Sequence, residues 1–365
     1  MLIGCTILSL AIANSNFGAH YHHFWQIQFA RHSLEHWVND GLMTIFFLLI
    51  GLELEREIYV GELSNFKDAL LPIFSAVGGI IIPAGIFIML NFGEATQSGA
   101  GIPMATDIAF ALGILSLLGN KVPTSLKVFL TALAVIDDLG AILIIAIFYT
   151  KTLLWTNLFI ALGIFALLLI FNKCKIRNLI PYLIGGIAMW YFMLNSGVHA
   201  TITGVLLAFA VPFGSGDETS PSYILQHFLH KPVAFIILPI FALANTAIVL
   251  SGNIAQTLTQ NYSVGIAVGL IAGKPIGIFL MSFLSVSLGL CKLPADLSWK
   301  SIAGVGFLGG IGFTMSIFIT LLAFDNETII NNAKFVILIS SLIAGLIGFL
   351  SLKIILKPVS LNNDE

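Results

Sequence analysis

Hydrophobic residues form long, nearly uninterrupted stretches in this chain, and short segments between them hold most of the charged, proline and asparagine residues. A membrane-spanning helix needs about 20 apolar residues, whereas the strands of a membrane barrel alternate apolar and polar positions. The continuous pattern therefore predicts helices. We assign twelve spans on this basis, at 1–15, 38–52, 69–91, 102–118, 126–149, 153–171, 179–195, 197–213, 232–250, 262–290, 301–324 and 335–356.

The composition agrees with burial in a bilayer. Of the 365 residues, 58% are hydrophobic and only 9% are charged, which is too little polar surface to enclose the chain in water. Helices satisfy every backbone polar group within the segment, as lipid requires. We therefore predict an all-α integral membrane protein. Because the intervening segments are too short for a soluble domain, residues 1–365 are expected to form a single transmembrane domain.

Basic residues are distributed unevenly between the two predicted sides of the membrane, which orients the chain. One side receives three of them, Arg31, Lys151 and Lys334. The other side receives twelve, and the sixteenth, Lys274, lies inside a span. The positive-inside rule then places both termini in the cytoplasm. The twelve are Arg56, Lys67, Lys121, Lys127, Lys173, Lys175, Arg177, Lys231, Lys292, Lys300, Lys353 and Lys357.

The net charge argues against a nucleic-acid partner, and the cysteine spacing argues against a metal site or a disulfide framework. The formal net charge is −2, and no basic stripe exists outside the loops, so nucleic acid is not an expected partner. The three cysteines, Cys5, Cys174 and Cys291, have neither the spacing of a metal site nor that of a disulfide framework. We expect no cofactor.

Four ionisable side chains lie deep in the predicted spans: Asp107, Asp137, Asp138 and Lys274. A charge at the bilayer centre costs roughly 2.5–3.5 kcal/mol on the most lenient scale, so each is a candidate functional residue. Asp107 and Lys274 are equally compatible with paired groups that hold helices together. A purely structural role is less favoured for Asp137 and Asp138, because no basic residue lies near this doublet in the sequence.

The doublet has the chemistry of a shared site for cations and protons. Carboxylates that lie close together in a dry environment bind protons near neutral pH. Once deprotonated, their oxygens are hard ligands that suit a small hard cation. Sodium and protons would then compete for one site. Neighbouring residues of a helix point about 100° apart, so one aspartate faces the pathway more directly, and the sequence does not say which.

Small residues interrupt two spans, in GIPMATD at 101–107 and in GFLGGIGFT at 306–314. Such runs also allow tight helix packing, but broken helices at matching positions of two halves are the best sequence indication of a transporter site. The fourth and eleventh spans match in this way, within inverted repeats of helices 3–5 and 10–12. If the two breaks cross near the midplane, Asp107 can face the positive half-helix ends, while Lys274 can face the negative ends or an aspartate.

Two other classes of membrane protein could use similar features. A sodium-coupled symporter would bind an organic anion, but Lys274 is the sole internal cation that could receive one, and the doublet would repel it. An intramembrane aspartyl protease needs two aspartates, which we would expect on facing helices and not side by side on one.

Four segments resemble those of NhaA-type bacterial sodium/proton antiporters. They are ATDIAFALG at 105–113, AVIDDLGA at 134–141, GKPIG at 273–277 and GIGFTMS at 310–316, and the resemblance extends from about 14 to 357. It implies exchange of Na⁺ or Li⁺ for H⁺ across the inner membrane, electrogenic with more than one H⁺ per Na⁺ and inactive at acid pH. Such an activity serves sodium and pH homeostasis, and the resemblance is compatible with a homodimer.

The resemblance also implies a role for each candidate residue. Asp137 and Asp138 would bind the exchanged ions, with Asp107 and Thr106 at the crossing of the broken helices and Lys274 as the charge partner. The family's pH-response positions would fall on Glu53, Glu57 and His199. For His199 a hydrogen-bonded packing role is an equal alternative, although the ordinary pKa of histidine, near 6.5, suits a sensor.

Overall fold

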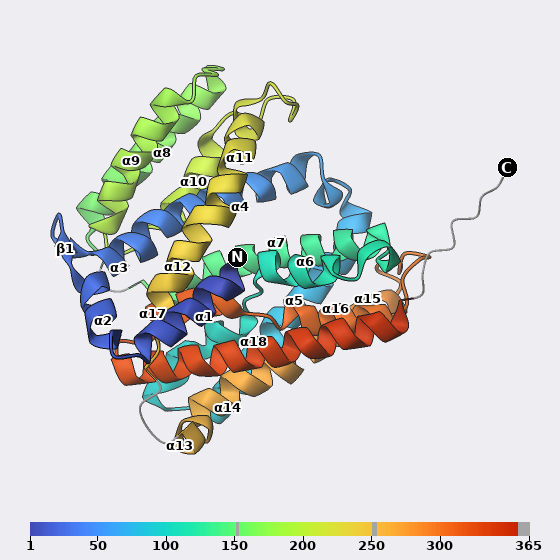
Figure 1. Cartoon of the computed structure of the whole chain (residues 1–365). Coiled ribbons are helices and arrows are strands. Elements are labelled where there is room, and N and C mark those ends of the chain that lie inside the picture. Colours follow the sequence, from blue (N-terminus) through green and yellow to red (C-terminus); the bar gives the residue numbers. More distant parts are fainter. Residues whose placement is uncertain (151–152, 250–253, 357–365) are drawn as a thin grey trace. The chain divides into compact units, whose positions relative to one another are not determined.

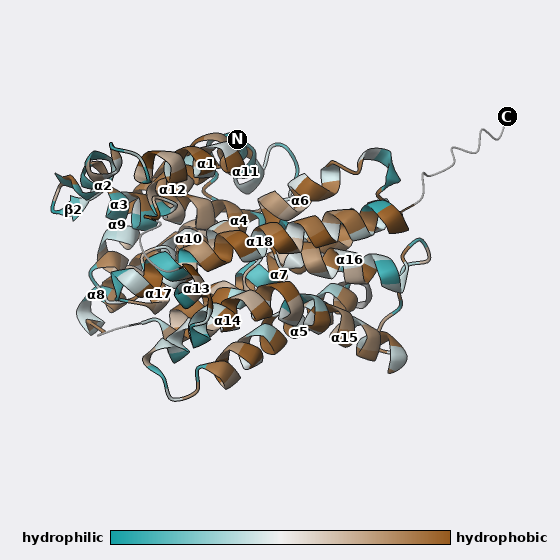
Figure 2. Ribbon diagram, turned by 60° about the horizontal axis from the view of Figure 1, so that its bottom comes forward, coloured by the Kyte–Doolittle hydropathy of each residue, from teal (hydrophilic) through white to brown (hydrophobic). Residues whose placement is uncertain are grey.

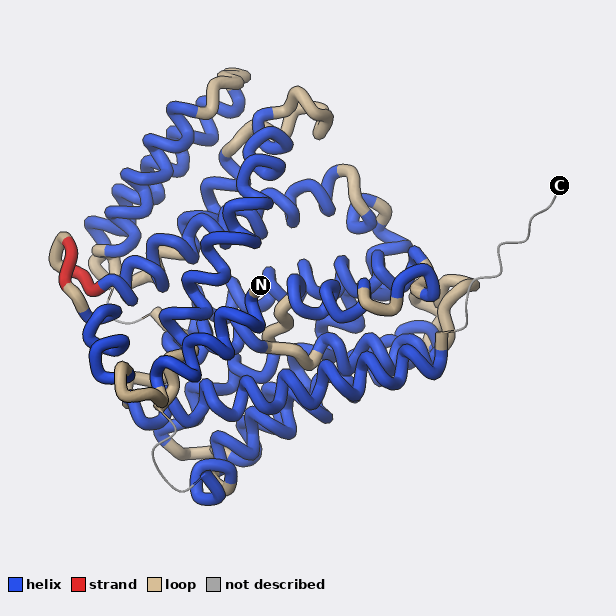
Figure 3. The backbone as a smooth tube through the Cα atoms, viewed as in Figure 1, coloured by secondary structure: helices blue, strands red, loops and turns tan. Residues whose placement is uncertain are grey.

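The chain is almost entirely helical (Figure 3) in a computed structural model that describes residues 1–150, 153–249 and 254–356. Within these residues the one sheet is a hairpin of two antiparallel strands, β1 (Gln28–Phe29) and β2 (His32–Ser33), with Gln28 opposite Ser33. The expectation of an all-α membrane protein is confirmed at this level. Two of the basic residues used to orient the chain, Lys151 and Lys357, lie outside the described residues. The same holds for residue 250, the end of one predicted span.

Two compact units divide the chain. The first unit comprises Met1–Gly61 and Ile142–Gly252. Its elements, labelled in Figure 1 where there is room, include the hairpin and the following helices: α1 (Leu2–Ala13), α2 (Gly18–Gln26), α3 (Leu34–His36), the π-helix η1 (Trp37–Leu42), α4 (Met43–Tyr59), α8 (Trp155–Lys173), α9 (Ile180–Leu194), α10 (Ile202–Ala210), α11 (Pro221–Pro232), the π-helix η5 (Val233–Ile237) and α12 (Leu238–Asn245).

The second unit comprises Glu62–Ala141 and Asn253–Glu365, and it contains the four ionisable residues singled out above. One helix, α7 (Thr124–Phe148), continues across the boundary between the units. The other elements are η2 (Glu62–Ser64), α5 (Phe66–Leu90), the 3-10 helix η3 (Ala95–Met104), α6 (Ile108–Ser116), η4 (Gly119–Lys121), α13 (Ile254–Leu258), α14 (Asn261–Val268), the π-helix η6 (Gly269–Gly273), α15 (Lys274–Ser287), α16 (Trp299–Gly309), α17 (Phe313–Ala323) and α18 (Glu327–Ile355).

Eight helical stretches in the described part are long and apolar enough to cross a membrane, and the number rises to ten if each of two bent pairs is one span. The bent pairs are α1 with α2, at 113°, and α16 with α17, at 48°. The predicted spans at 179–195 and 197–213 correspond to α9 and α10, which have only 15 and 9 residues. The chain is therefore a multi-span membrane protein, while the number twelve and the inverted repeats stay predictions.

Hydropathy follows the helices as expected for contact with lipid. Apolar residues run along the helical ribbons, and polar residues gather in many of the loops and at many helix ends (Figure 2). On α8 and α9 large apolar side chains are open to the outside, among them Phe159 at 64% and Ile187 at 70% exposure. A water-soluble protein rarely exposes so much contiguous apolar surface, so these helices are suited to face hydrocarbon.

Two glycines allow α5 and α15 to pack closely in the second unit. A methyl group on Gly78 would lie 2.1 Å from the carbonyl oxygen of Gly277, and a methyl group on Gly277 would lie equally close to that of Gly78. The same two helices are also joined by a buried hydrogen bond of 2.6 Å between the hydroxyls of Ser75 and Ser282. This contact fixes α15, whose first residue is Lys274.

Two further ionisable residues are buried in helices where the sequence analysis placed them outside the spans. Glu55 is 4% exposed because α4 continues seven residues beyond 52, the predicted end of its span. Lys334 is 5% exposed inside α18, which begins at Glu327, whereas we had assigned it to a loop. Both errors concern the ends of predicted spans. A helix can continue through charged residues, whereas a span predicted from hydropathy ends at the first of them.

Candidate ion-binding site

Two interrupted helices form the centre of the second unit, at the positions that the small-residue strings predict. The first changes from the 3-10 helix η3 to an extended backbone at Ala105, and α6 starts again after Asp107. The second ends as α16 at Gly309 and restarts as α17 at Phe313. Each interruption leaves backbone groups without a partner in their own helix, and these groups need partners elsewhere.

Groups at each interruption form hydrogen bonds with groups at the other. The amide N–H of Asp107 donates to the carbonyl of Ile311 at 2.7 Å. The hydroxyl of Ser316, in α17, donates to the carbonyl of Ile102 at 2.7 Å. The hydroxyl of Thr106 lies 2.8 Å from the carbonyl oxygen of Gly309. The two interruptions are therefore joined by hydrogen bonds, whereas the crossing of two broken spans near the midplane of a bilayer stays a prediction.

Asp107 neutralises the N-terminal ends of both restarted helices. One carboxylate oxygen accepts from the amide N–H of Phe110 at 3.0 Å and so caps α6. The other accepts from the amide of Thr314 at 3.2 Å and from its hydroxyl, in the first turn of α17. A single carboxyl group therefore accepts hydrogen bonds from the first turns of two helices, where the backbone carries partial positive charge.

Asp137 lies on α7 and is 1% exposed. Its Oδ2 lies 2.7 Å from the ammonium Nζ of Lys274 and 2.7 Å from the hydroxyl of Thr106. Its Oδ1 is buried and accepts no hydrogen bond from the residues that the structure describes. One oxygen is thus bound on two sides, and the other can still act as a ligand.

Lys274 is fully buried and makes both of the contacts considered for it from the sequence. Besides its ion pair with Asp137, Nζ donates to the carbonyl oxygen of Met104, the last residue of η3. Carbonyls at a helix C-terminus carry partial negative charge, so the lysine stabilises this end as well as the aspartate. Removing Lys274 would leave both groups buried without compensation.

Asp138 follows on the same helix and is 2% exposed. It interacts electrostatically with Lys274. Because adjacent helical residues point about 100° apart, Asp138 faces a different direction from the Asp137–Lys274 pair. Two carboxylates and one ammonium group are therefore buried in one place. Their formal charge is −1 when all three are ionised, which suits one monovalent cation.

Some contact residues were missed from the sequence. Thr314 and Ser316 belong to the string at 310–316, but we gave them no role. Their partners, Asp107 and Ile102, lie more than 200 residues away in the sequence. One signal could have identified Thr314, because a hydroxyl residue in the first turn after a predicted break is well placed to satisfy a capping carboxylate.

The three predicted pH-response residues lie in the first unit. The carboxylate of Glu53 lies 3.8 Å from the Nδ1 atom of His230, a partner that the sequence did not indicate. Glu57 follows one helical turn later on α4. His199 places Nε2 2.9 Å from the carbonyl oxygen of Tyr149 and also interacts electrostatically with Asp40.

Comparisons with known proteins identify the family. The sequence model of the family described as Na⁺/H⁺ antiporter 1 matches residues 1–352. The chain is 77% identical over 364 residues to a Na⁺/H⁺ antiporter NhaA of Flavobacterium psychrophilum, covering 100% of this chain and 95% of that protein. Its identity to the protein of the same name from Cytophaga hutchinsonii is 62%, covering 99% and 93% of the two chains.

A more distant relative extends the comparison. The Na⁺/H⁺ antiporter NhaA of Caulobacter vibrioides is 47% identical over 354 residues, covering 95% of this chain and 86% of that protein. Proteins of this family are secondary transporters and not enzymes, so the protease alternative is excluded. The interrupted helices, the buried aspartates and these matches lead to one conclusion: the chain belongs to the Na⁺/H⁺ antiporter 1 family.

Proposed function

We propose that this chain exchanges Na⁺ or Li⁺ for H⁺ across the bacterial inner membrane, with both termini in the cytoplasm. The observation that carries the proposal is the buried pair of Asp137 and Lys274 beside Asp138, held where two interrupted helices meet. Family membership and the relatives' names support sodium and protons as the transported ions. Lithium is included because it offers the same charge and hardness to carboxylate oxygens.

Exchange follows if the cation and the protons cannot occupy the site together. A cation at the doublet needs at least one ionised carboxylate, and it competes with Lys274 for the oxygens of Asp137. Protonation of the carboxylates removes the charge that binds the cation. The site would therefore bind either the cation or protons on each side of the membrane. It would open to the two sides in turn.

Thr106 is placed to follow the protonation state of Asp137. A hydroxyl has one proton to donate, yet Thr106 lies within 2.7 Å of the carboxylate oxygen and 2.8 Å of the carbonyl of Gly309. When Asp137 is ionised, Thr106 donates to it. When Asp137 is protonated, the acid can donate to Thr106, which then donates to Gly309. Both states are hydrogen-bonded without movement of the helices.

Three titratable groups at the site allow more than one proton per cation. Asp137, Asp138 and Lys274 can together release two protons when one sodium ion binds, and the difference in charge makes the cycle electrogenic. We further propose that activity falls at acid pH, with Glu53, Glu57 and His199 contributing to the response. This activity would serve sodium and pH homeostasis, and the chain could act as a homodimer.

The proposed exchange can be tested in vesicles. Vesicles that contain the chain are given a pH gradient, acidic inside, which a fluorescent weak base reports by quenching. Adding sodium or lithium alone should restore fluorescence, and adding choline should not. A sodium-coupled symporter would leave the gradient intact without its organic solute. Repeating the assay with a potassium ionophore that clamps the membrane potential distinguishes electrogenic from electroneutral exchange. No response to either cation would refute the proposed function.

A further inference from the structure

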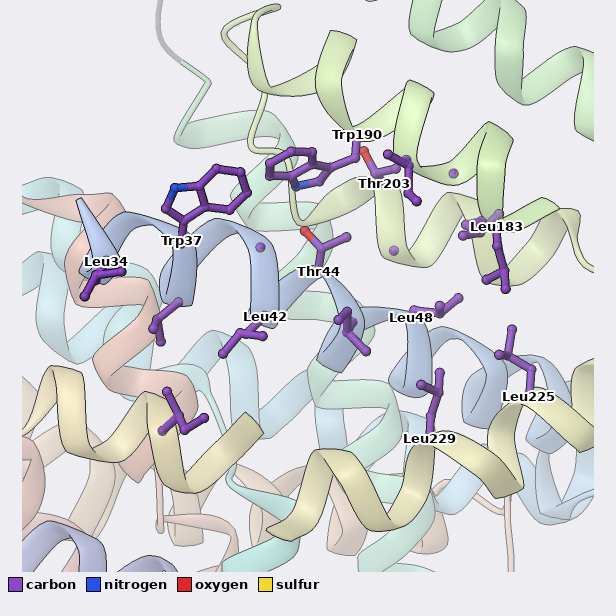
Figure 4. Close-up of a pocket in the computed structure, with 18 of the residues that line it drawn as sticks. Leu34, Trp37, Leu42, Thr44, Leu48, Leu183, Trp190, Thr203, Leu225 and Leu229 are labelled. Carbon is purple, nitrogen blue, oxygen red and sulfur yellow. The ribbon is translucent and has the colours of Figure 1, made fainter. Parts of the chain in front are cut away.

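A large apolar cavity lies within the first unit, away from the aspartates in sequence and outside the proposed exchange. Its volume is about 930 Å³, and its wall is almost entirely apolar. Helices α4, α9, α10 and α11 contribute side chains to its wall (Figure 4). Among them are Leu48, Leu183, Leu207, Leu225 and Leu229. Nothing in the proposed ion exchange uses this space.

Water is a poor occupant of the cavity. At ~30 Å³ per molecule, about 30 water molecules would be needed to fill it, and each needs two to four polar partners. The wall offers the hydroxyls of Thr44 and Thr203 and few other polar groups. An apolar molecule is favoured instead, because it removes the leucine side chains from water.

One end of the cavity has the character of a membrane interface. Trp37 and Trp190 lie there with their ring centroids 5.8 Å apart, and Trp25 also lines the wall (Figure 4 labels the first two). Tryptophan is enriched where a bilayer passes from hydrocarbon to headgroups. The wall continues along one helical stretch from Trp37 to Leu48, which is about 16 Å at 1.5 Å per residue, close to half of a ~30 Å hydrocarbon core.

Two buried donors at this cavity lack acceptors among the described residues, while two tryptophans of the wall have them. The indole N–H groups of Trp37 and Trp190 donate to the backbone carbonyls of Phe29 and Asp40. The indole nitrogen of Trp25 and the hydroxyl of Thr203 are buried, and neither has a hydrogen-bond partner among the described residues. Thr203 is only 1% exposed. A buried donor without an acceptor is unfavourable, so a bound molecule that supplies an acceptor gains affinity there.

We propose that this cavity binds one acyl chain of a membrane phospholipid, from the leaflet at the end marked by the three tryptophans. The chain lies against the leucines between α4, α9 and α11. The ester carbonyl of the same lipid accepts the N–H of Trp25 at the interface. The length of one leaflet, the apolar wall and the unsatisfied donor together match this occupant.

The test uses nanodiscs that hold a single chain each, so that a second copy cannot supply the occupant. The lipid carries a photoactivatable group near the end of its acyl chain, and cross-linked peptides are mapped after illumination. We expect cross-links on Leu48, Leu183 and Leu229 in excess of those on the lipid-facing helix α8. An even distribution over all lipid-facing helices, or no label in the cavity, would overturn the proposal.

Two variants sharpen the assignment. A side chain on Gly41, which lines the cavity, would meet only the ring of Trp37, at 3.5 Å, so Gly41→Leu should fill the space and remove the cavity cross-links. Gly163→Leu is the matched control, because Gly163 on α8 has open space and does not line the cavity. Persistent cavity cross-links in folded Gly41→Leu would contradict the proposal.

The headgroup end is tested separately with Trp25→Phe, which keeps the ring and removes the donor. The parent should retain ester-linked phospholipid in preference to its ether-linked analogue, which has no ester carbonyl, and the variant should lose this preference. Equal retention of both lipids by the parent would refute the hydrogen bond from Trp25. Exchange activity serves as a check of folding, since none of these positions belongs to the ion site.

Discussion

At the scale of single residues, the proposal that Asp137 and Asp138 bind the exchanged ions makes them the least replaceable positions. We expect Asp137→Asn and Asp138→Asn each to reduce sodium-dependent exchange to background, because an amide is neither a titrating group nor a charged ligand. The variants should still insert in the membrane. Initial rates in vesicles at matched protein amounts, with size-exclusion profiles in detergent as the folding control, check this. Near-normal rates in either variant would contradict the proposed site.

Lys274 should respond in a graded way, because its contacts are electrostatic. Lys274→Arg keeps a charge near Asp137 and the carbonyl of Met104, so partial activity and near-parent stability are expected. Lys274→Ala leaves a carboxylate buried without its partner, and breaking a buried pair costs about 3–5 kcal/mol. Thermal unfolding in detergent should show a much larger loss for alanine. Equal stability and activity of the two variants would show that the lysine does not balance charge.

Thr106 should influence the pH at which exchange occurs. Its hydroxyl donates to the ionised form of Asp137, and a hydrogen bond to a charged group contributes roughly 1.5–3 kcal/mol. Without it a higher pH is needed to ionise the carboxylate, so the activity profile of Thr106→Val should move to higher pH by about one unit. Thr106→Ser keeps the hydroxyl and should retain the parent profile. Identical profiles for valine and serine would refute this role.

At the scale of helices, the close contact of α5 and α15 positions Lys274 and should not tolerate a larger residue. In Gly277→Ala the new methyl group would lie 2.1 Å from the backbone oxygen of Gly78, so the helices must separate. Such overpacking costs roughly 1–3 kcal/mol. Gly85→Ala, on α5 with open space around it, is the control. A lower unfolding temperature is expected for the first variant alone, and equal temperatures would mean that this contact is not critical.

The sequence predicts which helices break but not how the breaks are joined. Glycine, proline and an isolated aspartate within apolar runs are local signals, and they located the interruptions before α6 and α17. One partner of Asp107 is Thr314, and one partner of Lys274 is the carbonyl of Met104. Each lies some 170 to 207 residues away along the chain, and no local pattern records such pairs. The buried Glu55 was missed for another reason, since hydropathy does not define where a helix ends.

At the scale of the whole molecule, the proposed response to acid pH involves His199, which contacts the residue that follows α7. This helix carries Asp138, and Tyr149, directly after its last residue, bonds through its carbonyl oxygen with the ring of His199. Protonating His199 changes the charge at this end of α7. We therefore expect His199→Ala and His199→Arg to shift the pH at which exchange appears while leaving the maximal rate largely unchanged.

The informative comparison for His199 is a set of pH profiles at saturating sodium, because saturation suppresses simple competition between sodium and protons. Superimposable profiles for the parent and both variants would make His199 a packing residue. Competition at Asp137 and Asp138 would then suffice to explain inactivity at acid pH, since a fall in pH protonates the carboxylates and lowers the apparent affinity for sodium.

The central claim is that sodium and protons displace one another at Asp137 and Asp138, and proton release on binding tests it most directly. Sodium is titrated into the purified chain in buffers of different ionisation enthalpy, and the dependence of the measured heat on the buffer gives the number of protons released per ion. The account predicts release of more than one proton by the parent near neutral pH and a smaller number, or no sodium binding, in Asp137→Asn and Asp138→Asn. Sodium binding without proton release by the parent, or unchanged release in both variants, would contradict it.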